Sequence, residues 1–207
     1  MKYIPLVLFI CFSLSLCNLT NRFKKSTSGP GSSPSSSGGD IAAEKAEPTA
    51  DQTAALAGGT KAIWDVQGMS WSVPAKWKEE TKELNSFMWR SPGGFDAASL
   101  IVSVANMADD FPTDSSLKAT FDQQKQRMKA LEVDEVKWLE IDGVKGVQFR
   151  EANPPKPDDS RRLQWITYRK FGGQVQQVNI MLASDGKGFP PHQDAMYGVL
   201  YSTKLVH

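Results

Sequence analysis

Histidine and carboxylate side chains are the residues of this 207-residue chain that could perform acid–base or metal chemistry. The two histidines are His192 and the last residue, His207, and neither stands at the spacing of a zinc site or beside the partners of a Ser-His-Asp triad. Acidic residues cluster at four places, none of which has the alternating ligands and central glycine of an EF-hand: Asp109–Asp110, Asp134–Glu135, Glu140 with Asp142, and Asp158–Asp159. A carboxylate-based hydrolase would require two of them to face each other across a cleft. We therefore expect a protein that is not an enzyme and that has no catalytic residue, metal or cofactor.

Aromatic and arginine residues offer a chemistry of binding instead. The 6 tryptophans lie between residues 64 and 165, and a tryptophan on an exposed concave surface could bind a sugar or a peptide. Most of them alternate with polar residues, as core positions of strands do, whereas Trp77 lies among charged residues after Pro74 and is expected to be exposed. Arg161 and Arg162 follow the proline-rich loop 153–159, and loops on rigid scaffolds often carry recognition. Trp77, Arg161 and Arg162 are thus the candidate binding surface.

Residues 1–17 have the pattern of a signal peptide. Lys2 gives a positive charge, and residues 4–16 form an apolar run that is shorter than the roughly 20 residues a membrane-spanning helix needs. Both cysteines, Cys11 and Cys17, lie in this leader, so the mature fold has no thiol with which to form a disulfide. The leader predicts export.

The leader ends in Leu14–Ser15–Leu16–Cys17, which resembles the lipobox of bacterial lipoproteins. Lipoboxes have a leucine three positions before the cysteine and a small residue after that leucine, as Leu14 and Ser15 are here. Leu16 departs from the pattern, because Gly, Ala or Ser usually stands immediately before the cysteine. The resemblance implies a lipid, palmitate among its acyl chains, on Cys17, and attachment to a membrane of the cell envelope. Two alternatives stay open. The leader could be cleaved after Ser15, which would give a soluble secreted protein, or it could remain uncleaved as an anchor.

A change of composition divides the mature chain. Residues 18–60 are rich in Ser, Gly, Pro and Ala, with no apolar periodicity, and predict a disordered tether. Residues 61–207 are long enough for one domain. This segment has as many basic as acidic residues and no basic block, which excludes a nucleic-acid partner.

The hydrophobic periodicity of residues 61–207 predicts an antiparallel sheet with helices. Asp142–Gly143 and Gly172–Gly173 favour tight hairpin turns between alternating segments. The expected strands are residues 62–66, 69–73, 86–90, 99–104, 135–141, 145–151, 161–170 and 174–183. A helix over 114–131 has Leu117, Phe121, Met128 and Leu131 on one face, and a last helix begins after Pro190–Pro191 and ends near Tyr201. This order of elements is α+β.

Several short motifs resemble the PsbP-like and DcrB-like domain lipoprotein family. They are the Trp71–Trp77 segment "WSVPAKW", the Ile141–Gly146 hairpin, the long Gly-Gly hairpin and the closing "YSTKLV". The resemblance covers almost the whole domain and implies a central antiparallel β-sheet flanked by helices, an α/β/α sandwich. It also implies a binding module, because PsbP-like domains are mostly binding proteins, although a fold alone does not transfer a function.

The sequence therefore predicts a lipid-anchored bacterial cell-envelope protein with a non-enzymatic PsbP-like binding domain, a protein-interaction or assembly factor. Its partner would be another envelope protein, which would bind an exposed apolar patch near the proline-rich loop. The alternative is an envelope lipoprotein that binds a small ligand or a glycan through exposed aromatic residues.

Overall fold

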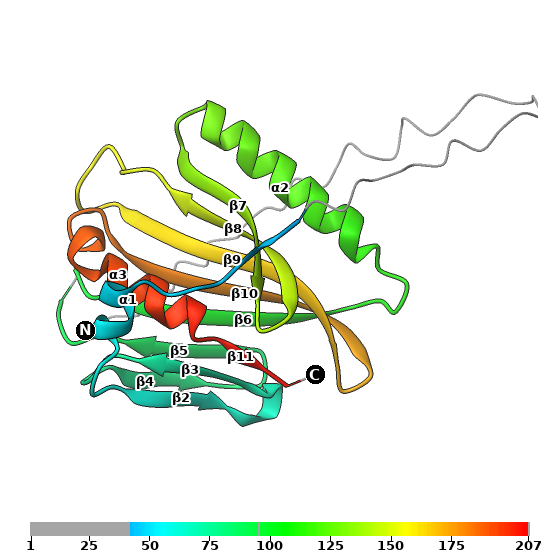
Figure 1. The fold of residues 1–207 in the computed structure, drawn as a ribbon, viewed down its shortest axis with the longest axis horizontal. Coiled ribbons are helices and arrows are strands. Elements are labelled where there is room, and N and C mark those ends of the chain that lie inside the picture. The colour runs from blue at the N-terminus through cyan, green and yellow to red at the C-terminus, as the bar shows by residue number, and fades with distance from the viewer. Residues whose placement is uncertain (1–41, 95, 207) are drawn as a thin grey trace, which may run out of the picture. The chain divides into compact units, whose positions relative to one another are not determined.

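Two β-sheets, of 8 and 3 strands, form the framework of the computed structural model, which describes residues 42–94 and 96–206 (Figure 1). The order in the larger sheet is β1-β7-β8-β9-β10-β6-β5-β4, and the order in the smaller sheet is β11-β3-β2. All neighbours are antiparallel except β1 and β7. The strands are β1 (Glu44–Lys45), β2 (Thr60–Trp64), β3 (Met69–Val73), β4 (Lys78–Lys82), β5 (Ser86–Arg90), β6 (Ser99–Met107), β7 (Val133–Ile141), β8 (Val144–Glu151), β9 (Ser160–Phe171), β10 (Gln174–Asp185) and β11 (Lys204–Leu205).

The two hairpin turns predicted at Asp142–Gly143 and Gly172–Gly173 are confirmed. Ile141 pairs with Val144 and Phe171 pairs with Gln174, so each turn has two central residues. All four central residues have positive φ, as a type I′ turn requires, and Asp142 is the only one that is not glycine. These turns fix the register of β7–β8 and of β9–β10, the longest strand pair (Figure 1).

Helices cover both faces of the larger sheet. Alternate β9 residues such as Leu163 and Trp165 are fully buried in the core cluster that includes α3 (Phe189–Tyr201) and the smaller sheet. Tyr168 faces the opposite side and belongs to a second cluster under α2 (Thr113–Lys129). The α+β class, with a central antiparallel sheet flanked by helices, is therefore confirmed.

A stack of aromatic rings joins the two sheets. The Phe87 ring of β5 lies between those of Trp64 and Trp71 from the smaller sheet, with centroid distances of 5.4 and 5.3 Å. All three side chains are fully buried. Because period-2 alternation turns these residues inward, the intervening residues of β2 and β3 face outward.

The expected tether is wrong for the described part of residues 18–60. Glu44–Lys45 forms β1 beside β7, and α1 (Ala50–Ala55) contacts α3. Thr49 begins α1 with a capping box in which Gln52 and Thr49 bond each other's backbone N–H groups. A helix this short, with no buried residue of its own, depends on its cap and on contact with α3, which composition does not reveal. We call residues 42–56 the strap; residues 1–41, including the leader and Cys17, lie outside the described part.

Candidate functional site

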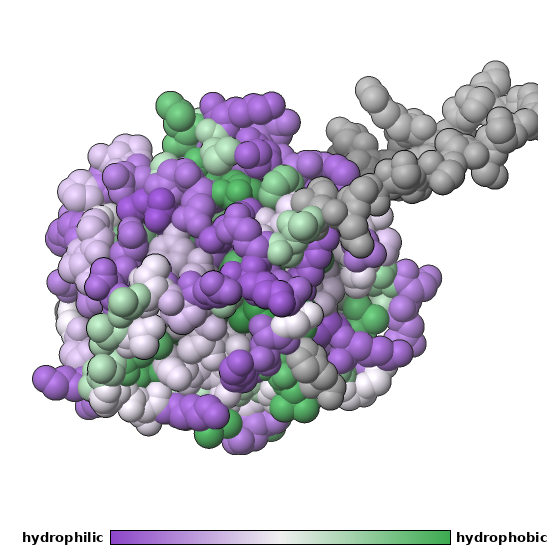
Figure 2. Space-filling view, viewed as in Figure 1, coloured by the Kyte–Doolittle hydropathy of each residue, from purple (hydrophilic) through white to green (hydrophobic). Residues whose placement is uncertain are grey.

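Exposed apolar side chains gather at one turn of the domain. Among the described residues, five large apolar side chains are exposed: Ile63, Val66, Leu84, Leu131 and Val206. All but Leu131 surround the turn between β2 and β3. The Gln67 side chain donates a hydrogen bond to the Leu84 carbonyl (2.7 Å), and the Val206 N–H donates to the Gly68 carbonyl (2.9 Å). We call Ile63, Val66, Leu84 and Val206 the turn patch, and Figure 2 shows green side chains near the end of β11 and the β2–β3 end of the smaller sheet.

Strand alternation and one tight turn place these side chains. Because Ala62 and Trp64 point into the core, Ile63 points outward. The 3₁₀ turn η1 (Asp65–Gln67) and Gly68, whose φ is +56°, then return the chain into β3 and leave Val66 56% exposed. A Cβ at Gly68 would lie 2.9 Å from the Phe171 ring and 3.0 Å from the Val206 Cβ, so the turn requires glycine.

The last residues of the chain form the other side of the patch. β11 pairs with Ser70 and Met69 of β3, and the Asp142 carboxylate accepts hydrogen bonds from the Leu205 N–H (2.8 Å) and from the Lys204 ammonium (2.9 Å). The hairpin turn between β7 and β8 thus holds β11 in place. Leu205 is buried, and Val206 is 59% exposed.

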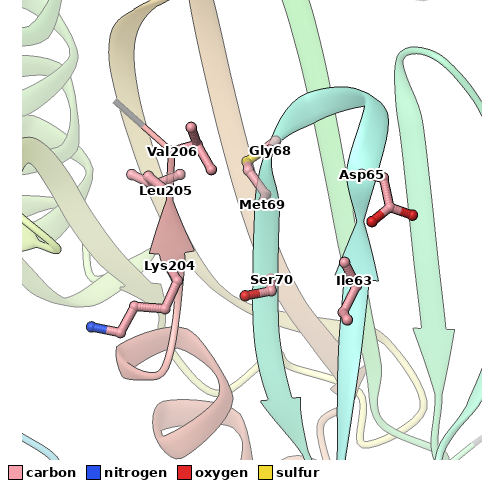
Figure 3. Close-up of a pocket in the computed structure, with 8 residues that line it drawn as sticks. All are labelled: Ile63, Asp65, Gly68, Met69, Ser70, Lys204, Leu205 and Val206. Carbon is pink, nitrogen blue, oxygen red and sulfur yellow. The ribbon is translucent and has the colours of Figure 1, made fainter.

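A cavity of about 300 Å³ lies within this arrangement (Figure 3). Its lining comes from β2, β3 and β11, with β3 between the other two strands in the view. The Lys204 side chain points away from β3 in Figure 3, so Gly68, Ser70, Ile63 and Val206 form an apolar or small-residue surface. Asp65 is the single carboxylate of the lining, and it pairs with Lys82 at 3.2 Å. This surface is suited to binding apolar groups, and it holds no pair of catalytic carboxylates.

Trp77 is not exposed, so that prediction is wrong. Its side chain is 6% exposed and belongs to the main core cluster. The Trp77 N–H donates to the Pro74 carbonyl, and Lys76 has a φ of +72°, so the chain after Pro74 turns back toward the core. The other tryptophans are buried as well, except Trp89, which is half-buried. The described residues therefore offer no exposed tryptophan as a platform for a glycan.

Arg161 is buried and Arg162 is half-exposed. Arg161 occupies the same face of β9 as Leu163 and Trp165, which turns it inward, and only 5% of its surface is exposed. It donates to Asp134 Oδ2 (2.7 Å) and to the Glu151 carbonyl (2.9 Å), and its guanidinium lies 4.4 Å from the centroid of the Phe189 ring. Arg162 donates to the Glu151 carboxylate (2.9 Å).

The proline-rich loop 153–159 lies at the other end of β9 from the turn patch. It precedes Ser160, whereas Phe171, beside Gly68, ends the strand. The intervening strand is about 36 Å long at roughly 3.3 Å per residue. The apolar patch expected near this loop is therefore at the opposite end of the sheet.

The Asp134–Glu135 acidic pair belongs to a network of ion pairs and hydrogen bonds. The Glu135 carboxylate accepts hydrogen bonds from the Gln148 amide (2.7 Å) and from the Tyr197 hydroxyl, and Arg150 donates to Asp134 (2.7 Å) and to the Tyr197 hydroxyl (3.1 Å). Burial, reinforced by the neighbouring Glu135 carboxylate, raises the pKa of Tyr197 well above its usual value. The network fastens α3 to β7 and β8.

The other acidic clusters and the histidines stand apart from this network. Asp109, Asp110, Asp158 and Asp159 are exposed, and His192 is half-buried on α3. His207 lies outside the described residues. Within residues 42–94 and 96–206, no group of three or more His, Cys, Asp and Glu side chains could hold a metal ion.

Comparisons with known proteins reveal a shared fold. No family model and no curated protein matches the chain. LpqN of Mycobacterium tuberculosis is similar over 72% of this chain and 86% of its own, with 10% sequence identity and a TM-score of 0.53. PsbP from the cyanobacterium Synechocystis sp. PCC 6803 matches over 71% of this chain and 92% of its own, with 10% identity and a TM-score of 0.47. A Bacteroides thetaiotaomicron protein matches with 15% identity and a TM-score of 0.45 over 72% of this chain, which spans about half (49%) of that protein.

The likeness to LpqN shows the fold of the domain, and PsbP is among the structures to which the chain is similar, as the sequence motifs indicated.

Proposed function

We propose that this protein is a lipid-anchored component of the bacterial cell envelope whose non-enzymatic domain binds another envelope protein through the turn patch. One observation carries the proposal. Four of the five exposed large apolar side chains in the described residues come together from three separate segments of the chain. Exposed apolar patches of this kind on soluble domains mark sites of association.

The envelope location is supported by the leader and by the fold. The signal-peptide pattern ends at Cys17 in a sequence that resembles a lipobox. LpqN, which has the same fold, is described as involved in cell envelope biogenesis. Within residues 42–94 and 96–206, no helix has both the length and the apolar character needed to span a bilayer.

A photo-crosslinking amino acid at position 66 tests the partner. In the native organism, we expect a crosslink to one identified envelope protein, because Val66 is an exposed residue of the turn that the patch surrounds. The double variant Val66→Asp and Leu84→Asp should weaken that complex by more than tenfold, since two charges would be buried in the interface. Leu131→Asp is the control, because Leu131 is also a large apolar residue that is exposed (83%) but lies outside the patch. Equal loss in both variants, or a crosslink only from position 131, would refute the role of the patch.

The mass and the detergent partitioning of the protein from its native membrane test the anchor. We expect a diacylglyceryl-type mass on Cys17, and a Cys17→Ala variant that stays unprocessed or leaves the detergent phase. An unmodified protein beginning at Leu16 would instead show that the domain is secreted in soluble form.

A further inference from the structure

A second cavity lies between the strap, the sheet and α3, away from the turn patch. Its volume is about 390 Å³, within the range of roughly 300–1,000 Å³ that is usual for small-ligand sites. Gln52 of the strap, Glu135 and Lys137 of β7, Arg150 of β8, and Tyr197 of α3 are among the residues that line it. Its lining side chains are polar or are tyrosines.

The inner wall of this cavity is held rigidly. The Tyr197 hydroxyl donates to Glu135, and it accepts a hydrogen bond from Arg150. Tyr197 is 5% exposed, and the fully buried Gln148 supports Glu135 from behind. Side chains fixed by their own neighbours are preorganised and lose little conformational entropy when a ligand binds.

Several polar groups at the cavity retain hydrogen-bonding capacity. The Gln193 amide, and the Nε2 of Gln52, form no hydrogen bond with another described side chain or backbone group. Donors and acceptors are therefore both present around the cavity.

The charges that line the cavity balance. Glu44, Glu47 and Glu135 oppose Lys45, Lys137 and Arg150. Lys137 lies 3.4 Å from the Glu44 carboxylate and 3.6 Å from that of Glu135. Because Lys137 and Arg150 already pair with these carboxylates, a ligand with a net charge would have to break such pairs, so the lining favours a ligand without net charge.

The half-buried Tyr201 ring adds apolar surface to this polar lining, beside the Lys137 ammonium, which lies 5.7 Å from the centroid of the ring. Tyr197 and Tyr201 pack edge to face with centroids 5.7 Å apart, and both rings line the cavity. Aromatic faces beside amide and carboxylate groups suit a molecule with C–H groups on its ring and hydroxyl groups at its edge.

We infer that this cavity binds a neutral polyhydroxylated ligand, a saccharide unit. The site is independent of the turn patch and of the proposed protein partner. The strap is its outer wall, held by the β1–β7 pairing and by the contact of α1 with α3 (Figure 1). Gly198 permits that contact, because a Cβ there would lie 2.6 Å from the Gln52 carbonyl.

Saturation-transfer NMR on the full chain in detergent tests this inference. The probes are D-glucose, D-galactose, D-mannose and N-acetyl-D-glucosamine, each compared with D-glucuronate and D-glucosamine as charged analogues. We expect saturation transfer to at least one neutral sugar and a signal at least fivefold weaker for both charged analogues.

Two variants locate the binding. Gln193→Leu should reduce the signal of the neutral sugar at least fivefold, because it removes an amide from the cavity without filling it. Gln174 is an exposed amide at the turn of the β9–β10 hairpin and serves as the control. Its variant Gln174→Leu should leave the signal unchanged. The inference is overturned if no neutral sugar receives saturation, if a charged analogue binds as well, or if Gln193→Leu has no effect. The crosslink from position 66 is unaffected by any of these results, so the two proposals fail separately.

Discussion

Among the described residues, Leu131 is the one non-glycine residue at the end of a helix that has a positive φ, which is 61°. The Leu131 N–H bonds to the Met128 carbonyl and the Glu132 N–H bonds to that of Arg127, which is the Schellman arrangement that glycine usually completes. The side chain is 83% exposed, so it gains no burial in return for this conformation. The strain at Leu131 is therefore uncompensated within the domain.

Leu131→Gly is expected to stabilise the domain. A left-handed conformation costs a non-glycine residue roughly 1–2 kcal/mol, and glycine loses roughly 0.5–1 kcal/mol more entropy on folding, so the net gain is about 0.5–1 kcal/mol. Thermal unfolding should show a melting temperature about 1–4 °C higher. Leu131→Ala keeps the Cβ and should show no such gain; an equal rise in both variants would contradict the explanation.

Arg161 is buried and its neighbour Arg162 is half-exposed, so truncating each to alanine should lower the free energy of unfolding by different amounts. Removing one partner of a buried ion pair costs on the order of 3–5 kcal/mol. The Asp134 side chain is 35% exposed, so we expect Arg161→Ala to lower the free energy of unfolding by about 2 kcal/mol. Arg162→Ala should cost less than about 1 kcal/mol, because the Arg162 side chain is 43% exposed. Urea unfolding of both variants measures the difference, and similar losses would show that Arg161 is not structural.

At the level of elements, the contact of α3 with β7 and β8 depends on a buried tyrosine. Tyr197 has a raised pKa in the folded protein, mainly through burial, whereas an unfolded tyrosine ionises near pH 10. Above that pH the unfolded chain loses this proton first, so the folded state binds more protons and the free energy of unfolding falls as the pH rises.

The Tyr197→Phe variant should therefore lose less stability than the wild type between about pH 9.5 and 11.5. Urea unfolding at several pH values measures both slopes. Below about pH 9 the tyrosine is neutral in both states, so the difference between the two proteins should be constant there. Parallel slopes throughout the alkaline range would mean that Tyr197 ionises in the folded protein as it does in the unfolded chain.

At the level of the whole molecule, the strap makes the folded unit begin before residue 61. Leu56 and Ala46 pack against the main core cluster, and the Ala46 N–H donates to the Glu140 carbonyl (2.9 Å). A chain that begins at residue 42 should therefore be more stable than one that begins at residue 61. We expect a difference of about 2 kcal/mol, comparable with the burial of one leucine side chain, and thus of several degrees in melting temperature. Equal melting temperatures of the two chains would show that the strap does not stabilise the domain, and that the folded unit begins at residue 61.

The edges of the larger sheet are protected in different ways. β4, at one edge, has the sequence Lys-Glu-Glu-Thr-Lys and a register shift between Glu79 and Thr81, both of which discourage pairing with another chain. β1, at the other edge, has only two residues. The turn patch lies away from these edge strands' backbone, at the β2–β3 turn of the smaller sheet and the β4–β5 connection, so association there would depend on apolar side chains.

Local sequence determined the hairpins and most of the strands. Asp142–Gly143 and Gly172–Gly173 need no distant contact to favour their turns, and period-2 alternation sets which residues of β9 and β10 face the core. Apolar periodicity and Pro190–Pro191 predict α2 and α3, although α3 begins at Phe189, before the two prolines, whereas α1 lies in the segment that the composition assigns to a tether. The leader pattern, which predicts export and a lipid on Cys17, is likewise a local property of the chain.

Only the tertiary structure decided which side chains are available for binding. Trp77 and Arg161 look exposed because charged or proline-rich residues surround them in the sequence, but a backward turn and strand alternation bury them. The turn patch and the saccharide cavity form where segments far apart in the sequence meet, as Leu84 meets Gln67 and Tyr197 meets Glu135. Such meetings depend on the packing of the two sheets and α3 as a whole, and no local pattern of residues encodes them.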